Sequence, residues 1–436
     1  MQETNTPTKI KKPKGLQAPR GMRDILPEEQ KYWRYVLRKA ESLLEDYAFE
    51  KISTPVLEFT DLFLRGTGES TDIIEKEIYN FKTKGGDDLA LRPEGTPAVV
   101  RAYIENGMQV RPHPVKLYYV EPMFRHDQPQ QGRYRQFFQL GVETLGDSSE
   151  AIDAELLFLG YKILNSLGLG NYNIHINSIG DQNCRPAYIR ALKDYYKTRM
   201  KKSCSNCKIR LKKNVLRVLD CKEEGCQEVI QGAPQMMDYL DEECKNHFKN
   251  VLEFLDEAKI PYILNPYLVR GLDYYTRTVF EFLPEENVGS QSTVIAGGRY
   301  DRMVDQLGGP KTPAAGWAMG IERVISALKE GQVNVPEIGI KPKVFLAQLG
   351  EMAKRKSLIL FEEVRKAGIE IKSSLGRDSI KAQLRIANRL GVKYALIFGQ
   401  KEALDDTVIL REMDSGIQEN IPLEKIVDEL KKRLKK

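Results

Sequence analysis

The sequence predicts an α+β protein in which a domain built on an antiparallel sheet, with a helical insertion, is followed by a small C-terminal α/β domain. Short apolar segments separated by Gly, Pro and Asp recur between residues 115 and 300, a pattern typical of strands joined by turns. Residues 182–255 are instead rich in Lys and Glu and helical in period. Beyond residue 336 strand and helix patterns alternate, which favours a separate α/β unit.

Length and composition support a folded protein of more than one domain. The chain has 436 residues, of which 41% are hydrophobic and 29% charged, so a disordered or fibrous protein is excluded. We find no apolar run long enough to cross a membrane and no signal-peptide core, so we expect a cytoplasmic protein without membrane contact. The net charge of +6 is compatible with a polyanionic partner but does not predict one.

The N-terminal half begins with a flexible basic tail. Residues 1–18 carry four lysines among Thr, Pro and Gly, and few apolar side chains are present to anchor them. Residues 27–47 have a helical pattern, and residues 52–57 are extended and interrupted by proline. The strands expected to form the sheet are residues 115–120, 136–143, 173–179, 278–282 and 293–296.

We interpret residues 182–255 as an insertion in a domain that spans residues 19–330. A linker is expected at residues 331–340, and residues 341–436 form the second domain. Its predicted strands are residues 343–348, 370–373, 393–398 and 407–411, and its predicted helices are residues 353–366, 379–390 and 423–434. Two of these strands are apolar almost throughout, as in strands that are buried on both faces and covered by helices.

Three arginines surround a turn rich in Gly, Pro and Gln between two predicted strands. They are Arg125, Arg133 and Arg135. Because a guanidinium group stays charged and binds phosphate in a bidentate manner, such a hairpin is a candidate triphosphate clamp. A solvated basic hairpin is equally compatible with the spacing.

Two further segments have the residue types of a small polar pocket. Glu94 lies between an arginine-proline pair and the glycine that precedes Thr96, and a carboxylate in such a place can hold an ammonium group. An exposed turn is the alternative, and spacing alone favours it. Arg270 stands beside a glycine and close to two tyrosines, a composition that suits a polar ligand pocket.

Neither of two further glycine-rich segments predicts a function by itself. Residues 297–301 lack a Walker pattern, and residues 316–323 are predicted to begin a helix whose first turns carry Glu322 and Arg323.

Taken together, these segments resemble the histidyl-tRNA synthetase family from residue 19 to the C-terminal helix. Residues 54–58, 124–143 and 316–323 are similar to motifs 1, 2 and 3 of class II synthetases. Residues 268–275 and 296–301 are similar to two peptides specific to the histidine enzymes. The resemblance implies a class II antiparallel-sheet catalytic domain with a helical insertion, followed by an anticodon-binding domain.

The resemblance also implies roles for individual residues. Histidine binding is implied for Glu94, Gly95, Thr96, Arg125, Gln139, Glu143, Arg270, Tyr274, Tyr275 and Tyr300, and ATP binding for Arg125, Arg133, Phe137 and Arg323. Glu94 and Thr96 would hold the substrate α-amino group, with Gln139 and Tyr300 nearby. Glu143 and Tyr275 would then recognise the imidazole, whose donor and acceptor suit a polar pocket.

Arg125 and Arg270 are the implied catalytic residues. They would lie at the substrate carboxylate and the α-phosphate, where charge builds as the carboxylate attacks ATP. Phe137 and Arg323 resemble the pair that sandwiches adenine, with Arg133 in the motif 2 loop. Mg²⁺ is expected to bridge the pyrophosphate that is released.

The implied activity is that of an enzyme, a histidine–tRNA ligase, with L-histidine, ATP and tRNA(His) as substrates. A homodimer through motif 1 is also implied. One alternative is the synthetase-like regulatory subunit of ATP phosphoribosyltransferase, which shares the fold but does not aminoacylate. Such subunits typically lose pocket residues and the C-terminal domain, whereas Arg125, Arg270 and Arg323 are present here. Another class II specificity, such as prolyl or threonyl, is the second alternative.

The insertion contains all six cysteines of the chain. Cys204 and Cys207 form a CxxC pair, and Cys221 and Cys226 form a second, wider pair at a separation similar to that of zinc ribbons. Four thiolates could bind a structural zinc ion that holds the insertion in shape and takes no part in catalysis. Zinc is no general requirement of the family, and reduced cysteines without metal are the alternative. We expect no structural disulfide.

Overall fold

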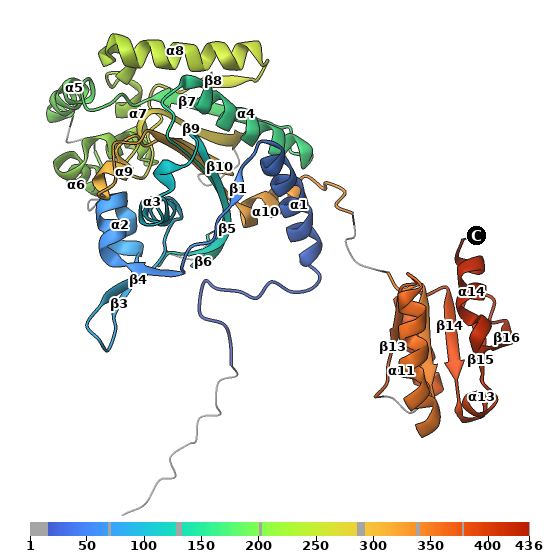
Figure 1. Ribbon diagram of the computed structural model, residues 1–436. Coiled ribbons are helices and arrows are strands. Elements are labelled where there is room, and N and C mark those ends of the chain that lie inside the picture. Colours follow the sequence, from blue (N-terminus) through green and yellow to red (C-terminus); the bar gives the residue numbers. More distant parts are fainter. Residues whose placement is uncertain are drawn as a thin grey trace, which may run out of the picture. The chain divides into compact units, whose positions relative to one another are not determined.

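The computed structural model describes residues 16–68, 71–127, 133–199, 203–285, 293–336, 341–376 and 379–435. The chain divides into an N-terminal unit, Met1–Pro336, and a C-terminal unit, Glu337–Lys436 (Figure 1). Most of the predicted basic tail and residues 337–340 of the predicted linker lie outside the described residues. Within the described part of the chain, none of the helices is both long and apolar enough to cross a membrane.

A central sheet of eight strands organises the N-terminal unit, as the predicted α+β class requires. In spatial order the strands are β1 (Glu50–Lys51), β5 (Val115–Phe124), β6 (Gln136–Leu145), β11 (Ala314–Gly320), β10 (Ile295–Arg299), β9 (Thr276–Pro284), β7 (Tyr172–Ser178) and β8 (Tyr262–Leu264). The inner pairs are antiparallel, and only the edge strands β1 and β8 join their neighbours in parallel. All five predicted strands belong to this sheet, which confirms them.

The prediction for residues 316–323 was wrong in its first half. Residues 316–320 are part of β11, and the helix begins only at Ile321, with Glu322 and Arg323 in its first turn. Gly316 lies opposite Glu143 of β6, and a Cβ atom at this position would lie 2.0 Å from a carboxylate oxygen of Glu143. The glycine therefore allows close approach of two strands rather than the start of a helix.

Side chains of successive residues in the strands enter two different cores. Tyr118 of β5 packs into the first core, while Leu117 and Tyr119 pack into the second on the other face, as the alternation of a strand dictates. The helices over the first face include α1 (Gln30–Asp46), α4 (Glu150–Ser166) and α10 (Ile321–Glu330) (Figure 1). The elements over the second face include α3 (Thr96–Glu105) and α9 (Met303–Gln306).

A small three-stranded sheet continues from motif 1. Its strands are β2 (Leu57–Phe59), β3 (Tyr79–Lys82) and β4 (Asp88–Leu91). The other short segments of this region are α2 (Thr60–Thr67), η1 (Ile73–Glu77) and η2 (Met108–Val110). Strand β4 lies between β2 and β3, and both pairs are antiparallel.

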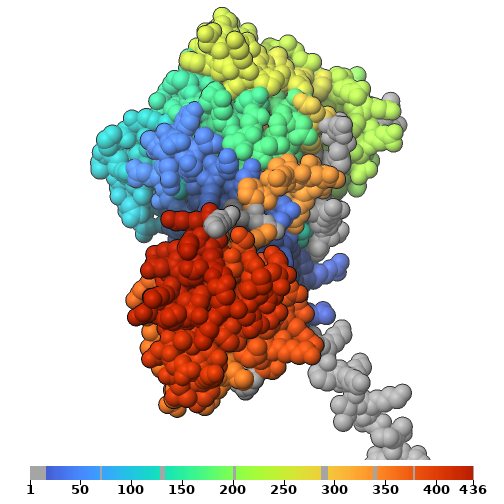
Figure 2. Space-filling view, turned by 90° about the vertical axis from the view of Figure 1, so that its right-hand side faces the viewer, coloured from blue at the N-terminus to red at the C-terminus, as the bar shows by residue number. Residues whose placement is uncertain are grey.

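The insertion between β7 and β8 is helical in the structure. Its elements are α5 (Arg185–Lys197), α6 (Ser205–Lys213), η4 (Val215–Asp220), α7 (Glu224–Gln231), η5 (Met236–Tyr239) and α8 (Glu242–Glu257). Helix α8 packs along α4, and its outer side forms part of the exposed surface of the N-terminal unit (Figure 2).

The C-terminal unit has its own five-stranded sheet with helices on both faces. Its elements are β12 (Val344–Gln348), α11 (Glu351–Lys366), β13 (Ile371–Ser373), α12 (Ile380–Leu390), β14 (Tyr394–Phe398), α13 (Gln400–Leu404), β15 (Thr407–Glu412), β16 (Gln418–Pro422) and α14 (Leu423–Leu434). Strand β12 pairs in parallel with β13 and β14. Val344 and Phe345 of β12 enter different cores, which confirms burial on both faces. The sequence analysis missed β16, a mostly exposed strand, and the short helix α13.

A buried arginine connects the extended run after β1 to the central sheet. The side chain of Arg92 is 2% exposed. Its Nε donates to the carbonyl oxygen of Pro122 at 2.9 Å, and its Nη1 donates to the carbonyl oxygen of Thr54 at 2.8 Å and forms an ion pair with Glu121. Glu121 in turn accepts a hydrogen bond of 2.9 Å from the backbone of Thr54. The segment that leads to Glu94 is thereby fixed against β5.

Replacement of Arg92 by methionine should destabilise the N-terminal unit by about 3–5 kcal/mol, because Glu121 would be left buried without its cation. The thermal unfolding midpoint measures this change. Arg65→Met is the matched control: Arg65 pairs with Asp61, and both side chains are at least 60% exposed, so less than about 1 kcal/mol is expected. Equal midpoints for the two variants would contradict the role of Arg92.

Candidate active site

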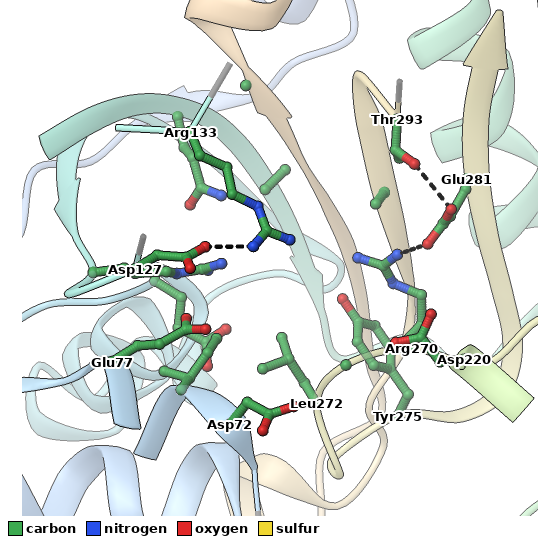
Figure 3. Close-up of a pocket in the computed structure, with 18 of the residues that line it drawn as sticks. Asp72, Glu77, Asp127, Arg133, Asp220, Arg270, Leu272, Tyr275, Glu281 and Thr293 are labelled. Atoms are coloured by element: carbon green, nitrogen blue, oxygen red, sulfur yellow. Dashed lines mark hydrogen bonds and ion pairs between the residues drawn. The ribbon is translucent and has the colours of Figure 1, made fainter. Parts of the chain in front are cut away.

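A cavity of about 620 Å³ opens in the N-terminal unit (Figure 3). Strands of the central sheet, the η1 segment and the insertion all contribute to its lining. The predicted site residues found there are Glu94, Gly95, Thr96, Arg125, Arg133, Phe137, Gln139, Arg270, Tyr274, Tyr275, Tyr300 and Arg323. Glu94 and Arg323 both line the cavity, although they are 229 positions apart in the chain.

Two predicted residues are positioned differently. Arg135 does not belong to the lining; its Nε donates to the carbonyl oxygen of Asp127 at 3.2 Å, so two of the three hairpin arginines face the cavity. Glu143 lies behind the cavity wall, where its carboxyl oxygens meet the hydroxyl groups of Thr96, at 2.6 Å, and of Tyr300. The carboxyl of Glu143 is therefore one layer deeper than the other candidates.

Glu94 gives one end of the cavity an anionic character. It is 4% exposed and accepts hydrogen bonds from the hydroxyl groups of Thr67, at 2.6 Å, and Tyr274, at 2.9 Å. Burial raises the pKa of Glu94, although these hydrogen bonds and the charge of Arg125 oppose the rise. A cationic group that entered the cavity here would stabilise the ionised carboxylate.

Burial also affects the carboxyl group of Glu143, which is 1% exposed. It raises the pKa of Glu143 to about 8, and the nearby carboxylate of Glu94 adds to the rise while the Thr96 and Tyr300 hydroxyls oppose it. At neutral pH the Glu143 carboxyl group of the free protein is therefore mostly protonated.

Arg270 lies across the cavity from Asp127 and Arg133 in the view of Figure 3. Its Nη1 forms an ion pair with Glu281, which also accepts a hydrogen bond of 3.0 Å from the Thr293 hydroxyl group. Its guanidinium carbon lies 6.0 Å from the ring centre of Tyr275. Among the described residues, the buried Nε of Arg270 and Oε1 of Gln139 have no hydrogen-bond partner, which is unusual for buried polar atoms and suits atoms that await a ligand.

Further guanidinium groups make this region strongly cationic. Arg125 lies 5.3 Å from the ring centre of Phe137, and its Nε donates to the carbonyl oxygen of Pro93 at 2.9 Å. Arg323 donates to the carbonyl oxygen of Thr293 at 2.7 Å. Burial lowers the pKa of Arg323, and the positive charges of Arg125 and of Arg133 lower it further. Such concentrated positive charge favours a polyphosphate ligand.

Comparison with known proteins decides the family. A model of the histidyl-tRNA synthetase family matches residues 21–324, and a model of an anticodon binding domain matches residues 343–433. The chain belongs to the histidyl-tRNA synthetase family. Its N-terminal unit accordingly has the class II synthetase fold, as the motifs predicted.

Relatives within the family are similar over almost their whole length. A histidine–tRNA ligase of Dehalococcoides mccartyi is 48% identical over 418 residues, which cover 96% of this chain and 100% of the relative. A histidine–tRNA ligase of a Geobacillus species is 43% identical over 421 residues, which cover 96% of this chain and 99% of the relative. The crystal structure of apo histidyl-tRNA synthetase from Staphylococcus aureus superposes with a TM-score of 0.78 at 37% identity, covering 95% of this chain and 100% of that one.

The fold is shared more widely than the sequence. A crystal structure described as an ATP phosphoribosyltransferase regulatory subunit/histidyl-tRNA synthetase from Bacillus halodurans has a TM-score of 0.63 at 21% identity, covering 89% of this chain and 99% of that one. At this identity the likeness concerns the fold alone.

The sequence analysis did not predict several residues that line the cavity of this member of the histidyl-tRNA synthetase family. Glu281 lies in the middle of β9 and has no motif around it. Arg217 belongs to the insertion and donates to Asp72 at 2.8 Å, and both line the cavity. The pairing joins residues 145 positions apart, so no local pattern could have indicated it.

The protonated Glu143 predicts a pH effect on stability. The pKa of Glu143 is raised from an ordinary 4.5 to about 8, so the native state binds more protons than the unfolded state between these values. Stability therefore falls as pH rises through this window, by at most about 1.4 kcal/mol per pH unit. We expect the thermal midpoint to fall more steeply from pH 6 to pH 8 in the wild type than in Glu143→Gln, in which this group cannot ionise. Parallel curves for the two proteins would contradict the raised pKa.

Proposed function

We propose that this protein is a histidine–tRNA ligase. It activates L-histidine with ATP to histidyl-adenylate and pyrophosphate, and then transfers histidine to the 3′-terminal adenosine of tRNA(His). The observation that carries the proposal is one cavity lined both by the carboxyl group of Glu94 and by the guanidinium groups of Arg125, Arg270 and Arg323. The names of the relatives, at 43% and 48% identity over nearly the full chain, support the same activity.

Recognition of histidine uses the anionic end. Glu94 binds the α-ammonium group, assisted by Thr96 and by the unpaired amide oxygen of Gln139. Glu143 and Tyr275 recognise the imidazole. Since both oxygens of Glu143 meet hydroxyl groups in the free protein, one of these contacts must be exchanged for an imidazole N–H. An analogue without that N–H would leave a buried carboxyl group unpaired and is rejected for this reason.

Activation of histidine needs no general base, because its carboxylate is already an anion. A carboxylate oxygen attacks the α-phosphorus of ATP, and the bond from phosphorus to the pyrophosphate oxygen breaks. Negative charge grows on the α-phosphate oxygens and on the leaving group. Arg125 and Arg270 stabilise this charge, and they do so effectively because the ion pair with Glu281 already orients Arg270.

Phe137 and Arg323 bind adenine from its two sides. Arg323 also lies near the terminal phosphates, and Arg133 contributes to ATP binding from the motif 2 loop. Mg²⁺ is held by substrate phosphates, water and one or two carboxylates in such sites, and Glu77 and Glu281 offer carboxylate oxygens in the cavity lining. The residues present therefore fit the ion. When bound, it would neutralise phosphate charge.

Transfer RNA binding involves the C-terminal unit, which matches an anticodon binding domain over residues 343–433. Helix α12 exposes Lys381, Arg385 and Arg389, which recur every four residues and so lie on one side of the helix. This spacing suits contacts with RNA phosphates.

A homodimer through motif 1 is part of the proposal. Four large apolar side chains of the small sheet and the residue before it are unusually exposed: Val56, 39%; Leu57, 40%; Phe59, 61%; and Phe81, 45%. Exposed apolar side chains gathered on one element favour a protein interface. Because the substrates ATP and transfer RNA meet in the cytoplasm, we place the enzyme there.

The regulatory alternative would use the same fold without aminoacylation. This chain keeps Arg125, Arg270 and Arg323 around the cavity and has the C-terminal unit, which favours the enzyme.

ATP–pyrophosphate exchange tests the function, and Arg270→Ala tests its mechanism. The wild type should exchange with histidine but not with proline or threonine. The variant should lose about 100-fold or more, because it lacks the cation at the α-phosphate. Arg302→Ala, which removes an exposed arginine paired with Asp305, should keep wild-type exchange. Absence of histidine-dependent exchange in the wild type would refute the function, and normal exchange in Arg270→Ala would refute the role.

Ending the chain after Pro336 should separate the two half-reactions. Pyrophosphate exchange should persist, because the cavity lies within the N-terminal unit. Charging of transfer RNA should fall by about two orders of magnitude, because phosphate contacts are lost. Substituting Lys381, Arg385 and Arg389 together by alanine should weaken charging less and reduce its salt dependence. Undiminished charging by the truncated chain would exclude a binding role for the C-terminal unit.

A further inference from the structure

The four cysteines of the two predicted pairs meet in the insertion, and we call them the thiol cluster. Cys204 precedes α6, Cys207 lies in its first turn, Cys221 follows η4 and Cys226 belongs to α7. Their sulfur atoms all lie within 4.8 Å of one another. The sulfur atoms of Cys204 and Cys221, which come from different elements, are 3.8 Å apart.

The separation of the Cys204 and Cys221 sulfur atoms matches one metal-binding geometry. A zinc ion bound to four thiolates at about 2.3 Å in a tetrahedron places its sulfur atoms about 3.8 Å apart. Disulfide sulfurs, in contrast, are about 2.05 Å apart, and all four cysteines of the cluster are unbridged. We propose that Cys204, Cys207, Cys221 and Cys226 bind one structural zinc ion.

Backbone N–H groups donate hydrogen bonds to two sulfur atoms of the thiol cluster. The backbone N–H of Cys204 donates to the sulfur of Cys226 at 3.2 Å, and that of Cys207 donates to the sulfur of Cys204 at 3.4 Å. Such hydrogen bonds orient metal ligands and stabilise their charge. The first turn of α6 also points its positive end toward the cluster. The basic residues of this helix, Lys208, Arg210, Lys212 and Lys213, offset the double negative charge of zinc with four thiolates.

A second group of possible ligands in the insertion lacks this character. Asp181, Cys184, Asp241 and Cys244 also have ligand atoms within 4.8 Å of one another. However, Asp241 caps α8 by accepting from the backbone of Cys244 at 2.8 Å, and Asp181 pairs with Arg277 at 3.5 Å. Helix capping and an ion pair explain these carboxylates, whereas neither explains four convergent thiols.

Short elements surround the thiol cluster, and their apolar side chains, such as Val218 and Ile230, pack into the second core. Helices α6 and α7 have nine and eight residues, and η4 has six. Helices this short are marginal in water, and residues 201–230 contain no aromatic side chain. One ion that joined all three elements would contribute its binding free energy to folding.

The same elements reach the active-site cavity. Arg210 and Arg217 donate to Asp72, which precedes η1, at 3.1 Å and 2.8 Å. Asn214 donates to Asp273, next to the Arg270 peptide, at 2.6 Å. Zinc would thereby hold a wall of the cavity in place. A site closed by four protein ligands leaves no position for substrate, so the ion is structural.

Zinc content of the full-length protein, purified without chelator, tests the proposal directly and does not depend on any activity. We expect about one zinc ion per chain, and X-ray absorption should give four sulfur neighbours at about 2.3 Å. A content well below one, or nitrogen and oxygen neighbours in place of sulfur, would overturn the proposal.

Cysteine variants locate the ion. Cys204→Ser combined with Cys207→Ser should lower bound zinc about tenfold or more, whereas Cys184→Ser, in the second group, should keep it. Retention of zinc by the double variant, or its loss from Cys184→Ser, would contradict the assignment. If the double variant does not fold, the wild-type content and sulfur neighbours still decide.

Hydrogen exchange tests the connection to the cavity. Chelation of the wild-type protein should accelerate amide exchange in residues 203–231 and in η1, which loses the partners of Asp72, while the C-terminal unit stays unchanged. Unchanged exchange in residues 203–231 after zinc removal would show that the ion does not hold this wall.

Discussion

The active site depends on the interactions of one buried side chain, the guanidinium group of Arg92. It binds the extended run at Thr54 to the end of β5 at Pro122 and Glu121. Its own backbone carbonyl accepts from Phe124, the residue before Arg125. The chain on one side of Arg92 leads to Glu94, so this single side chain fixes the spacing between the carboxylate and the guanidinium group that are proposed to bind the two ends of an amino acid.

The cavity combines two kinds of support. Its floor is the central sheet, whose strands are fixed by backbone pairing and by cores on both faces. One wall belongs to the helical insertion, whose contacts with Asp72 and Asp273 are polar. The sheet therefore carries the groups that must keep their geometry during chemistry. The insertion adds a wall to the cavity, and the proposed metal ion would stabilise that wall.

Local patterns predicted what depends on neighbours in the sequence. The strands that alternate between two cores, the arginines of the β5–β6 hairpin and the peptide around Arg270 were all found in this way. Three features were missed because distant residues create them. Residues 314–320 form a strand by pairing with β6 and β10, where Gly316 lies against Glu143. Glu281 matters because it pairs with Arg270, and the depth of Glu143 follows from hydroxyl groups on two other elements. The family resemblance implied the roles of the site residues. The raised pKa of Glu143, in contrast, comes from its burial, which the sequence does not show.

The ion pair of Arg270 with Glu281 has a consequence for turnover. In the free protein this guanidinium group is already desolvated, oriented and neutralised by Glu281, which is itself held by Thr293. An arriving phosphate or carboxylate must share or displace that partner, so the affinity gained is the difference between two ion pairs. Under the proposed function, Glu281 would therefore compete with anionic ligands for Arg270 and would restore the ion pair when they leave.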